Sequence, residues 1–70
     1  MKRTRVDSSA LRSVGYDEGV AVLEIEFVSG EVYRYHAVPA SIHRELMDAE
    51  SRGRYFVENV RDVYPTTRLT

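Results

Sequence analysis

Cysteine is absent from this sequence, so neither a disulfide bond nor a thiolate metal site can stabilise the fold. No uncharged apolar run is longer than a few residues, which excludes a membrane-spanning helix. The basic start, MKRTRVDSSA, lacks the apolar segment of a signal peptide. The net charge is -1, without the basic excess that is usual in proteins that bind nucleic acid through phosphate contacts. These absences favour a cytoplasmic protein and restrict any phosphate binding to a local patch.

The composition is that of one small globular domain. Of the 70 residues, 43% are hydrophobic and 30% are charged. A chain of this length buries only about 60% of the surface that its unfolded form exposes, so packing alone, or packing helped by self-association, must stabilise it. We expect a mobile leader over residues 1–7, the domain over 8–64 and a frayed tail over 65–70.

Two runs of alternating apolar residues, joined by a glycine turn at Gly30, give the strongest structural signal. The alternating positions are Leu23, Ile25, Phe27, Tyr33 and Tyr35. A period of two is typical of β-strands, and with a weaker strand at 11–16 it predicts a three-stranded meander over 11–16, 20–28 and 31–37.

The loop at 28–30 determines which residues of this hairpin face each other. A three-residue loop places Leu23 opposite Tyr35 and Ile25 opposite Tyr33, so both tyrosines face the core. On the other face Glu24 pairs with Arg34. The alternative for the two tyrosines is stacking on RNA bases. Arg34 is expected in a solvated charge ladder, with a binding role as its alternative.

The first hairpin is less well determined. A three-residue connection at 17–19 would leave Val14, Tyr16, Val20 and Val22 on the sheet face that no helix covers. Such an apolar strip is typical of contacts with a protein partner or a second copy. A register shift would bury Val14 instead, and both alternatives stay open.

After residue 37 the apolar period changes to that of a helix. Pro39 suits the first turn of a helix, and Ile42, Leu46 and Ala49 recur at helical spacing. Gly53 is expected to end this helix. A second helix from about residue 54 has Phe56, Val60 and Val63 on its apolar side. The predicted fold is α+β: a three-stranded antiparallel β-meander followed by two α-helices packed on one face.

The ordered set of these residues resembles the KTSC domain, a short module named for its occurrence at the C-terminus of some lysyl-tRNA synthetases. The matching residues are Ser8-Ser9, Val14-Gly15-Tyr16-Asp17, Leu23, Phe27, Gly30, Tyr33-Arg34-Tyr35, Val38-Pro39, Ala49, Ser51-Arg52-Gly53, Tyr55-Phe56, Asn59, Arg61 and Tyr64. The connection at 17–19 is shorter than in the pattern. The resemblance implies a domain without established biochemical activity or catalytic residues, for which RNA binding has been suggested from the synthetase association.

The candidate ligand site lies at the junction of the two predicted helices. Arg52 and Arg54 flank Gly53, Tyr55 follows, and Arg61 is on the second helix. Guanidinium groups near the N–H groups that open a helix are suited to bind a phosphate or another anion. The alternative is that these side chains cap and solvate the helix ends.

Other chemistries have less support in the sequence. His36 and His43 lack metal-ligand spacing, so we expect no metal and no cofactor. Ser8 has no base placed beside it, so its hydroxyl is expected in a turn and the protein is expected not to be an enzyme. The sequence predicts a non-enzymatic binding module for RNA or another phosphate-bearing ligand. The alternative is a protein-interaction or self-association module that uses the open sheet face.

Overall fold

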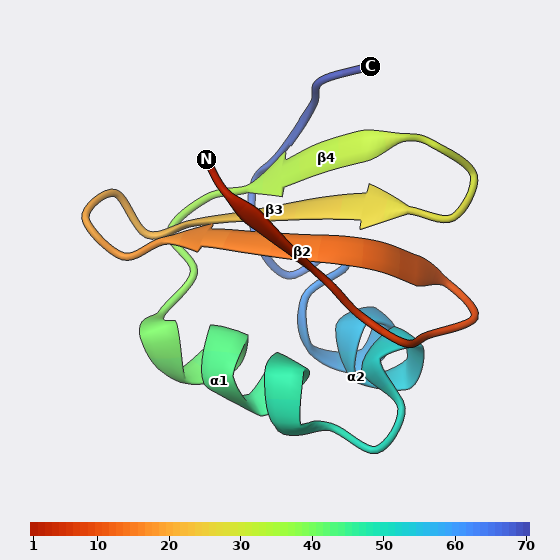
Figure 1. Ribbon diagram of the computed structural model, residues 1–70. Helices are drawn as coiled ribbons and strands as arrows, with labels where there is room; N and C mark the ends of the chain where they lie inside the picture. The colour runs from red at the N-terminus through yellow and green to blue at the C-terminus, as the bar shows by residue number, and fades with distance from the viewer.

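The computed structural model describes residues 1–70 and shows a five-stranded antiparallel sheet with two helices on one of its faces (Figure 1). The strands lie side by side in chain order. The elements are β1 (Arg3–Arg5), β2 (Leu11–Asp17), β3 (Val22–Phe27), β4 (Val32–Tyr35), α1 (Ala40–Asp48), α2 (Arg52–Asn59) and β5 (Thr66–Arg68).

The predicted α+β class and the two helices are confirmed, but the sheet has five strands and not three. The predicted meander corresponds to β2, β3 and β4. The additional strands, β1 and β5, come from the segments predicted as a leader and a tail, and they pair with β2 and β4. All side chains of β1 and β5 are exposed, so these strands have no apolar alternation that would indicate them in the sequence.

The register of the β3–β4 hairpin is as predicted. Leu23 lies opposite Tyr35, Glu24 opposite Arg34 and Ile25 opposite Tyr33. Gly30 has φ +98°, the left-handed conformation that glycine adopts without strain. Tyr35 is buried, Tyr33 is half-buried, and both pack on the core side of the sheet.

The predicted connection of the first hairpin is wrong. The turn spans residues 18–21, with a positive φ of 56° at Ala21, and Asp17 lies opposite Val22. From Ser13 to Asp17 this register differs from the predicted one by an odd number of residues, so these side chains lie on the opposite face from the one predicted. Val14 lies opposite Ile25 and is buried, so of the two alternatives left open by the sequence the register shift is the one found, and the apolar strip on the outer face is not formed.

A β-bulge near the start of β2 places a further β2 side chain in the core. Leu11 pairs with Phe27, but Ser13 pairs with Glu26, so two β2 steps correspond to one step on β3. Because of the extra residue, Leu11 and Val14 both point into the core, while Arg12 is exposed.

Both helices begin close to the predicted positions, but Gly53 does not end the first one. α1 begins after Pro39 and ends at Asp48. Ser51 is the N-cap of α2, and its Oγ accepts a hydrogen bond from the Arg54 backbone N–H at 3.2 Å. Gly53 therefore lies in the first turn of α2, where a Cβ would lie 3.3 Å from that of Ala10.

The core lies between the sheet and the two helices. Its buried members are Leu11, Val14, Leu23, Ile25, Tyr35, Val38, Leu46, Phe56 and Val60. Phe56 and Val60 pack as predicted, whereas Val63 is exposed because α2 ends at Asn59. Neither helix has the length and apolar character needed to cross a membrane.

Candidate aromatic ligand-binding pocket

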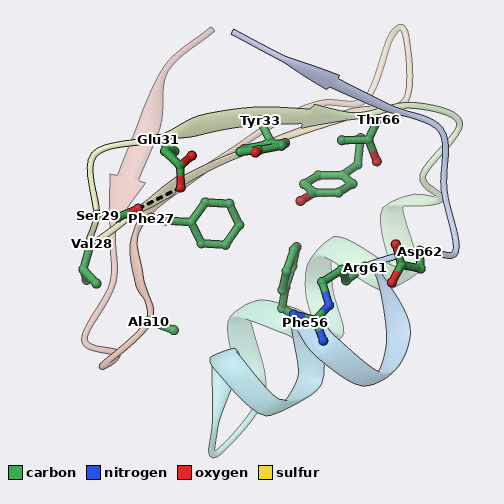
Figure 2. Close-up of a pocket in the computed structure, with 11 residues that line it drawn as sticks. Ala10, Phe27, Val28, Ser29, Glu31, Tyr33, Phe56, Arg61, Asp62 and Thr66 are labelled. Atoms are coloured by element: carbon green, nitrogen blue, oxygen red, sulfur yellow. Dashed lines mark hydrogen bonds between the residues drawn. The ribbon is translucent and has the colours of Figure 1, made fainter. Parts of the chain in front are cut away.

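A pocket of about 570 Å³ opens between the β3–β4 hairpin and α2. Figure 2 shows Phe27, Tyr33 and Phe56 turned toward this space. The eleven lining residues are Ala10, Phe27, Val28, Ser29, Glu31, Tyr33, Tyr35, Phe56, Arg61, Asp62 and Thr66. The pocket thus combines residues from the β3–β4 hairpin, the residue before β2, α2, the turn after α2 and the start of β5.

Four aromatic rings of the pocket form a closed circuit, in which each ring contacts two others. Phe56 lies 5.3 Å from Phe27 and 5.3 Å from Tyr35, both edge-to-face. Tyr33 lies 5.7 Å from Phe27, edge-to-face, and 6.5 Å from Tyr35, nearly parallel. These are the distances and angles that aromatic pairs favour, so the rings hold one another in place.

Charged side chains of both signs stand at the rim. Arg61 and Asp62 follow the end of α2, where Asp62 has a positive φ of 62°. Neither takes part in an ion pair within the protein. On the other side, the Arg68 Cζ lies 5.9 Å from the Tyr33 ring centre, and Arg68 pairs with Glu31 at 2.9 Å.

Burial, followed by the influence of Tyr33, raises the pKa of Tyr35 to about 12. Arg61 lowers this pKa and Asp62 raises it, both by smaller amounts. The Tyr35 phenol is therefore protonated at neutral pH. It can donate a hydrogen bond, and no protein group accepts one from it.

The four residues predicted as an anion site do not line one pocket. Arg61 lines the aromatic pocket, whereas Arg52 lines a polar pocket and donates to the Met47 carbonyl oxygen at 2.8 Å. Arg54 is exposed, with its Nε 3.8 Å from a Glu58 oxygen. The Tyr55 hydroxyl donates to Glu45 at 2.7 Å, so it ties α2 to α1. Anion binding at this helix junction stays a prediction.

The Tyr33-Arg34-Tyr35 segment divides between the two faces of the sheet. The tyrosines line the aromatic pocket, and Arg34 lies on the outer face, where its Nε donates to Glu24 Oε1 at 2.8 Å. The two tyrosines thus pack on the core and also line the pocket. In the sequence, a core position and a ligand-facing position were alternatives for them.

Ser8 and His43, which were considered for catalysis or metal binding from the sequence, make contacts within the fold. The Ser8 Oγ accepts hydrogen bonds from the backbone N–H groups of Ala10 and Leu11, which is the turn expected for it. His43 stacks on Tyr16 at 4.8 Å, and burial lowers its pKa. The structure has no group of three or more histidine, aspartate or glutamate side chains that could hold a metal ion.

Part of this pocket could not be predicted from the sequence. The sequence pattern places Phe27, Tyr33 and Tyr35 on one face and Phe56 on the apolar side of the second helix. The closed circuit depends on where α2 packs across the sheet, for which the sequence has no local signal. The role of Asp62 was missed as well, because only the turn after α2 brings it to the rim.

The fold defines a small single-domain α+β protein, with an antiparallel sheet covered on one face by two helices. The KTSC domain model matches residues 7–64, and the chain belongs to this family. A KTSC domain protein from Yersinia pestis has a crystal structure that superposes with a TM-score of 0.96 at 33% identity, covering 99% of this chain and 97% of that one.

Two kinds of relative are similar in sequence. An uncharacterized protein from Stutzerimonas stutzeri is 52% identical over 56 residues, which is 80% of this chain and 79% of that protein. A lysine–tRNA ligase from Nostoc punctiforme is 31% identical over 64 residues, which is 91% of this chain but only 11% of the ligase. The domain therefore occurs both as a small protein and as a minor part of a much larger enzyme.

Proposed function

We propose that this KTSC domain is a non-enzymatic module that binds single-stranded RNA by taking an unpaired nucleobase into the aromatic pocket. The observation that carries the proposal is that four mutually packed aromatic rings contribute to the lining of an open pocket of about 570 Å³. Unpaired bases bind proteins mainly by stacking on aromatic side chains, with about 1–3 kcal/mol per base.

The charged rim suits a nucleotide. The Arg61 guanidinium, which makes no ion pair, is available to the sugar-phosphate, and the carboxylate of Asp62 can accept from amino groups on a base edge. The net charge of the protein is -1, so phosphate attraction over the whole surface is small. Stacking in the pocket must therefore supply most of the affinity.

The relatives support an RNA partner. Several proteins that contain a similar segment are named lysine–tRNA ligases, so this domain is found in enzymes that handle an RNA. An RNA partner also agrees with the cytoplasmic location that the sequence predicts.

The test compares a short labelled RNA in single-stranded form with the same sequence in a duplex, by fluorescence anisotropy. We expect the single strand to bind more tightly, because bases in a duplex are not free to enter the pocket. Tyr33→Leu should weaken this binding by about 5-fold or more, the equivalent of one lost stack. Tyr64→Leu is the matched control, since Tyr64 packs on the core outside the pocket.

Arg61→Gln provides a second variant that leaves the core intact, because the Arg61 side chain is exposed. It should also weaken binding to the single strand. Equal affinity for single and double strands, or equal affinities of Tyr33→Leu and Tyr64→Leu, would refute the base-binding pocket. Absence of RNA binding even at low salt would refute the RNA function as a whole.

A protein-interaction or self-association module is the second prediction from the sequence. Its expected surface was the apolar strip, and the burial of Val14 removes that basis. The outer face presents Arg3 and Arg34 instead, whose guanidinium groups both pair with the buried carboxylate of Glu24. Sedimentation velocity tests this alternative, and a concentration-independent monomer would count against self-association.

A further inference from the structure

A second hollow, of about 360 Å³, lies on the opposite face of the sheet from the aromatic pocket. Its lining residues are Met1, Arg3, Arg5, Arg12, Ser13 and Glu26. Arg3 and Arg5 of β1 pair with Gly15 and Ser13 of β2, which alternate with the core-facing Val14. The two arginines therefore point to the outer face, away from the helices.

Two of the three guanidinium groups are held in place by the protein itself. The Arg3 Nη1 donates to Glu24 Oε2 at 3.0 Å, and Glu24 is buried. The Arg12 Nη2 donates to the Val28 carbonyl oxygen at 3.1 Å. These contacts use only part of the donors of each guanidinium, which has five N–H groups. The remaining donors are positioned before any ligand arrives, so a ligand need not order them.

Arg5 supplies a charge that no protein group neutralises, since it takes part in no ion pair. The carboxylate in the lining, that of Glu26, accepts from the Ser13 hydroxyl at 2.8 Å and lies 3.9 Å from Arg12 Nη1. Three arginines and one glutamate line the hollow, and the Glu24 carboxylate beside Arg3 offsets one more charge, so a positive excess remains in a protein with a net charge of -1. The hollow is therefore locally positive, although the protein as a whole is slightly negative.

We infer that this arginine hollow, formed by Arg3, Arg5 and Arg12, is a binding site for a phosphate group. Guanidinium groups match the oxygen pairs of a phosphate, and such charge-assisted hydrogen bonds are about twice as strong as neutral ones. The site does not depend on the aromatic pocket, which opens on the other face. Its phosphate comes either from an RNA backbone or from a free phosphate compound.

The first experiment follows the Nε–Hε NMR signals of the arginine side chains during titration with inorganic phosphate, with chloride at the same ionic strength as the reference. We expect the signals of Arg3, Arg5 and Arg12 to shift together with one dissociation constant. Arg5→Gln should weaken this binding by about 5-fold or more, because it removes a charge-assisted contact. Since Arg5 makes no ion pair, the variant should keep the fold.

Arg54→Gln is the matched control, because it makes the same charge change at an exposed arginine outside the hollow. Its phosphate affinity should stay within about twofold of the unmodified protein, since only a distant screened charge is lost. If phosphate does not shift the three signals beyond the chloride reference, or if Arg5→Gln and Arg54→Gln have equal affinities, the site does not exist.

A second arm identifies the source of the phosphate, with short single-stranded RNA in place of inorganic phosphate. If the RNA backbone occupies the hollow, Arg5→Gln should reduce the salt-dependence slope of RNA binding by about 0.7. The slope should fall by the same amount when Arg5→Gln is combined with Tyr33→Leu. Equal reductions would show that the arginine hollow acts independently of the aromatic pocket. If RNA leaves the three signals unchanged while inorganic phosphate shifts them, the ligand is a free phosphate compound.

Discussion

Gly15 of β2 lies directly opposite Arg3 of β1, and the Arg3 side chain passes over it. A Cβ atom on Gly15 would lie 2.9 Å from the Arg3 Cγ. The same atom would lie 2.9 Å from the Lys2 carbonyl oxygen, which belongs to the backbone and cannot rotate away. Glycine at this position in β2 therefore allows β1 to approach and places Arg3 over the sheet, where it reaches Glu24. The absence of a side chain at Gly15 is therefore what allows β1 to pair with β2 at this point.

Gly15→Ala is expected to destabilise the protein by about 1–3 kcal/mol, because the added methyl group overpacks the contact with β1. Urea unfolding followed by circular dichroism measures the change. Gly19→Ala is the control, since its nearest contact is a flexible Asp17 Oδ1 at 3.3 Å. Equal stability of the two variants would contradict the close packing of β1 on Gly15.

Leu46→Ala is expected to lower the free energy of unfolding by about 2–5 kcal/mol, the usual cost of a cavity in a core. Leu46 is fully buried and is a member of the core cluster between the sheet and the helices. Such a loss is a large fraction of the stability of a small domain. Val57→Ala, at a half-exposed position of α2, should change stability by less than about 0.5 kcal/mol. A similar melting temperature for both variants would contradict the assigned helix faces.

His43 should make the stability depend on pH. Burial lowers its pKa below the ordinary value of 6.5, so the folded state binds the proton less tightly than the unfolded state does. The contribution of His43 is therefore fully present above the unfolded pKa of 6.5. It is lost as the pH falls through 6.5 toward the lower pKa of the folded state.

The measurement is the urea midpoint of the wild type and of His43→Phe between pH 5 and 8, the range in which an ordinary histidine titrates. Phenylalanine keeps a ring for stacking on Tyr16 but does not titrate in this range. We expect the wild type to lose more stability than the variant toward low pH. Parallel pH profiles would show that His43 has the same pKa in both states.

The register of the β3–β4 hairpin was predictable, although both strands are shorter than the predicted 20–28 and 31–37, because two independent signals agree there. The alternation from Leu23 to Tyr35 defines the buried face, and Gly30 adopts the positive φ that the turn requires. In the first hairpin the corresponding residue is Ala21, whose φ of 56° is unusual for a residue with a side chain. Because Gly19 is the glycine in this stretch, the sequence favours a connection at 17–19 and leaves the register open, whereas the turn has its positive φ at Ala21.

The candidate sites were less predictable than the fold, because they combine segments that are distant in the chain. Phe56 meets Phe27 only after α2 packs on the sheet. Arg5 and Arg12 line one hollow only because β1 folds back along β2. The sequence shows arginines near both ends of the chain and at the helix junction, without any local signal to tell which of them lie close together.

The location of β1 and β5 at the two edges of the sheet affects how the domain should be studied. Each is three residues long and consists of exposed arginine and threonine residues. Short, charged edge strands are a common protection against pairing between molecules. A fragment limited to residues 8–64 would remove both strands and expose the N–H and C=O groups of β2 and β4. Association of such a fragment would then reflect unprotected sheet edges, and its oligomers would say nothing about the native protein.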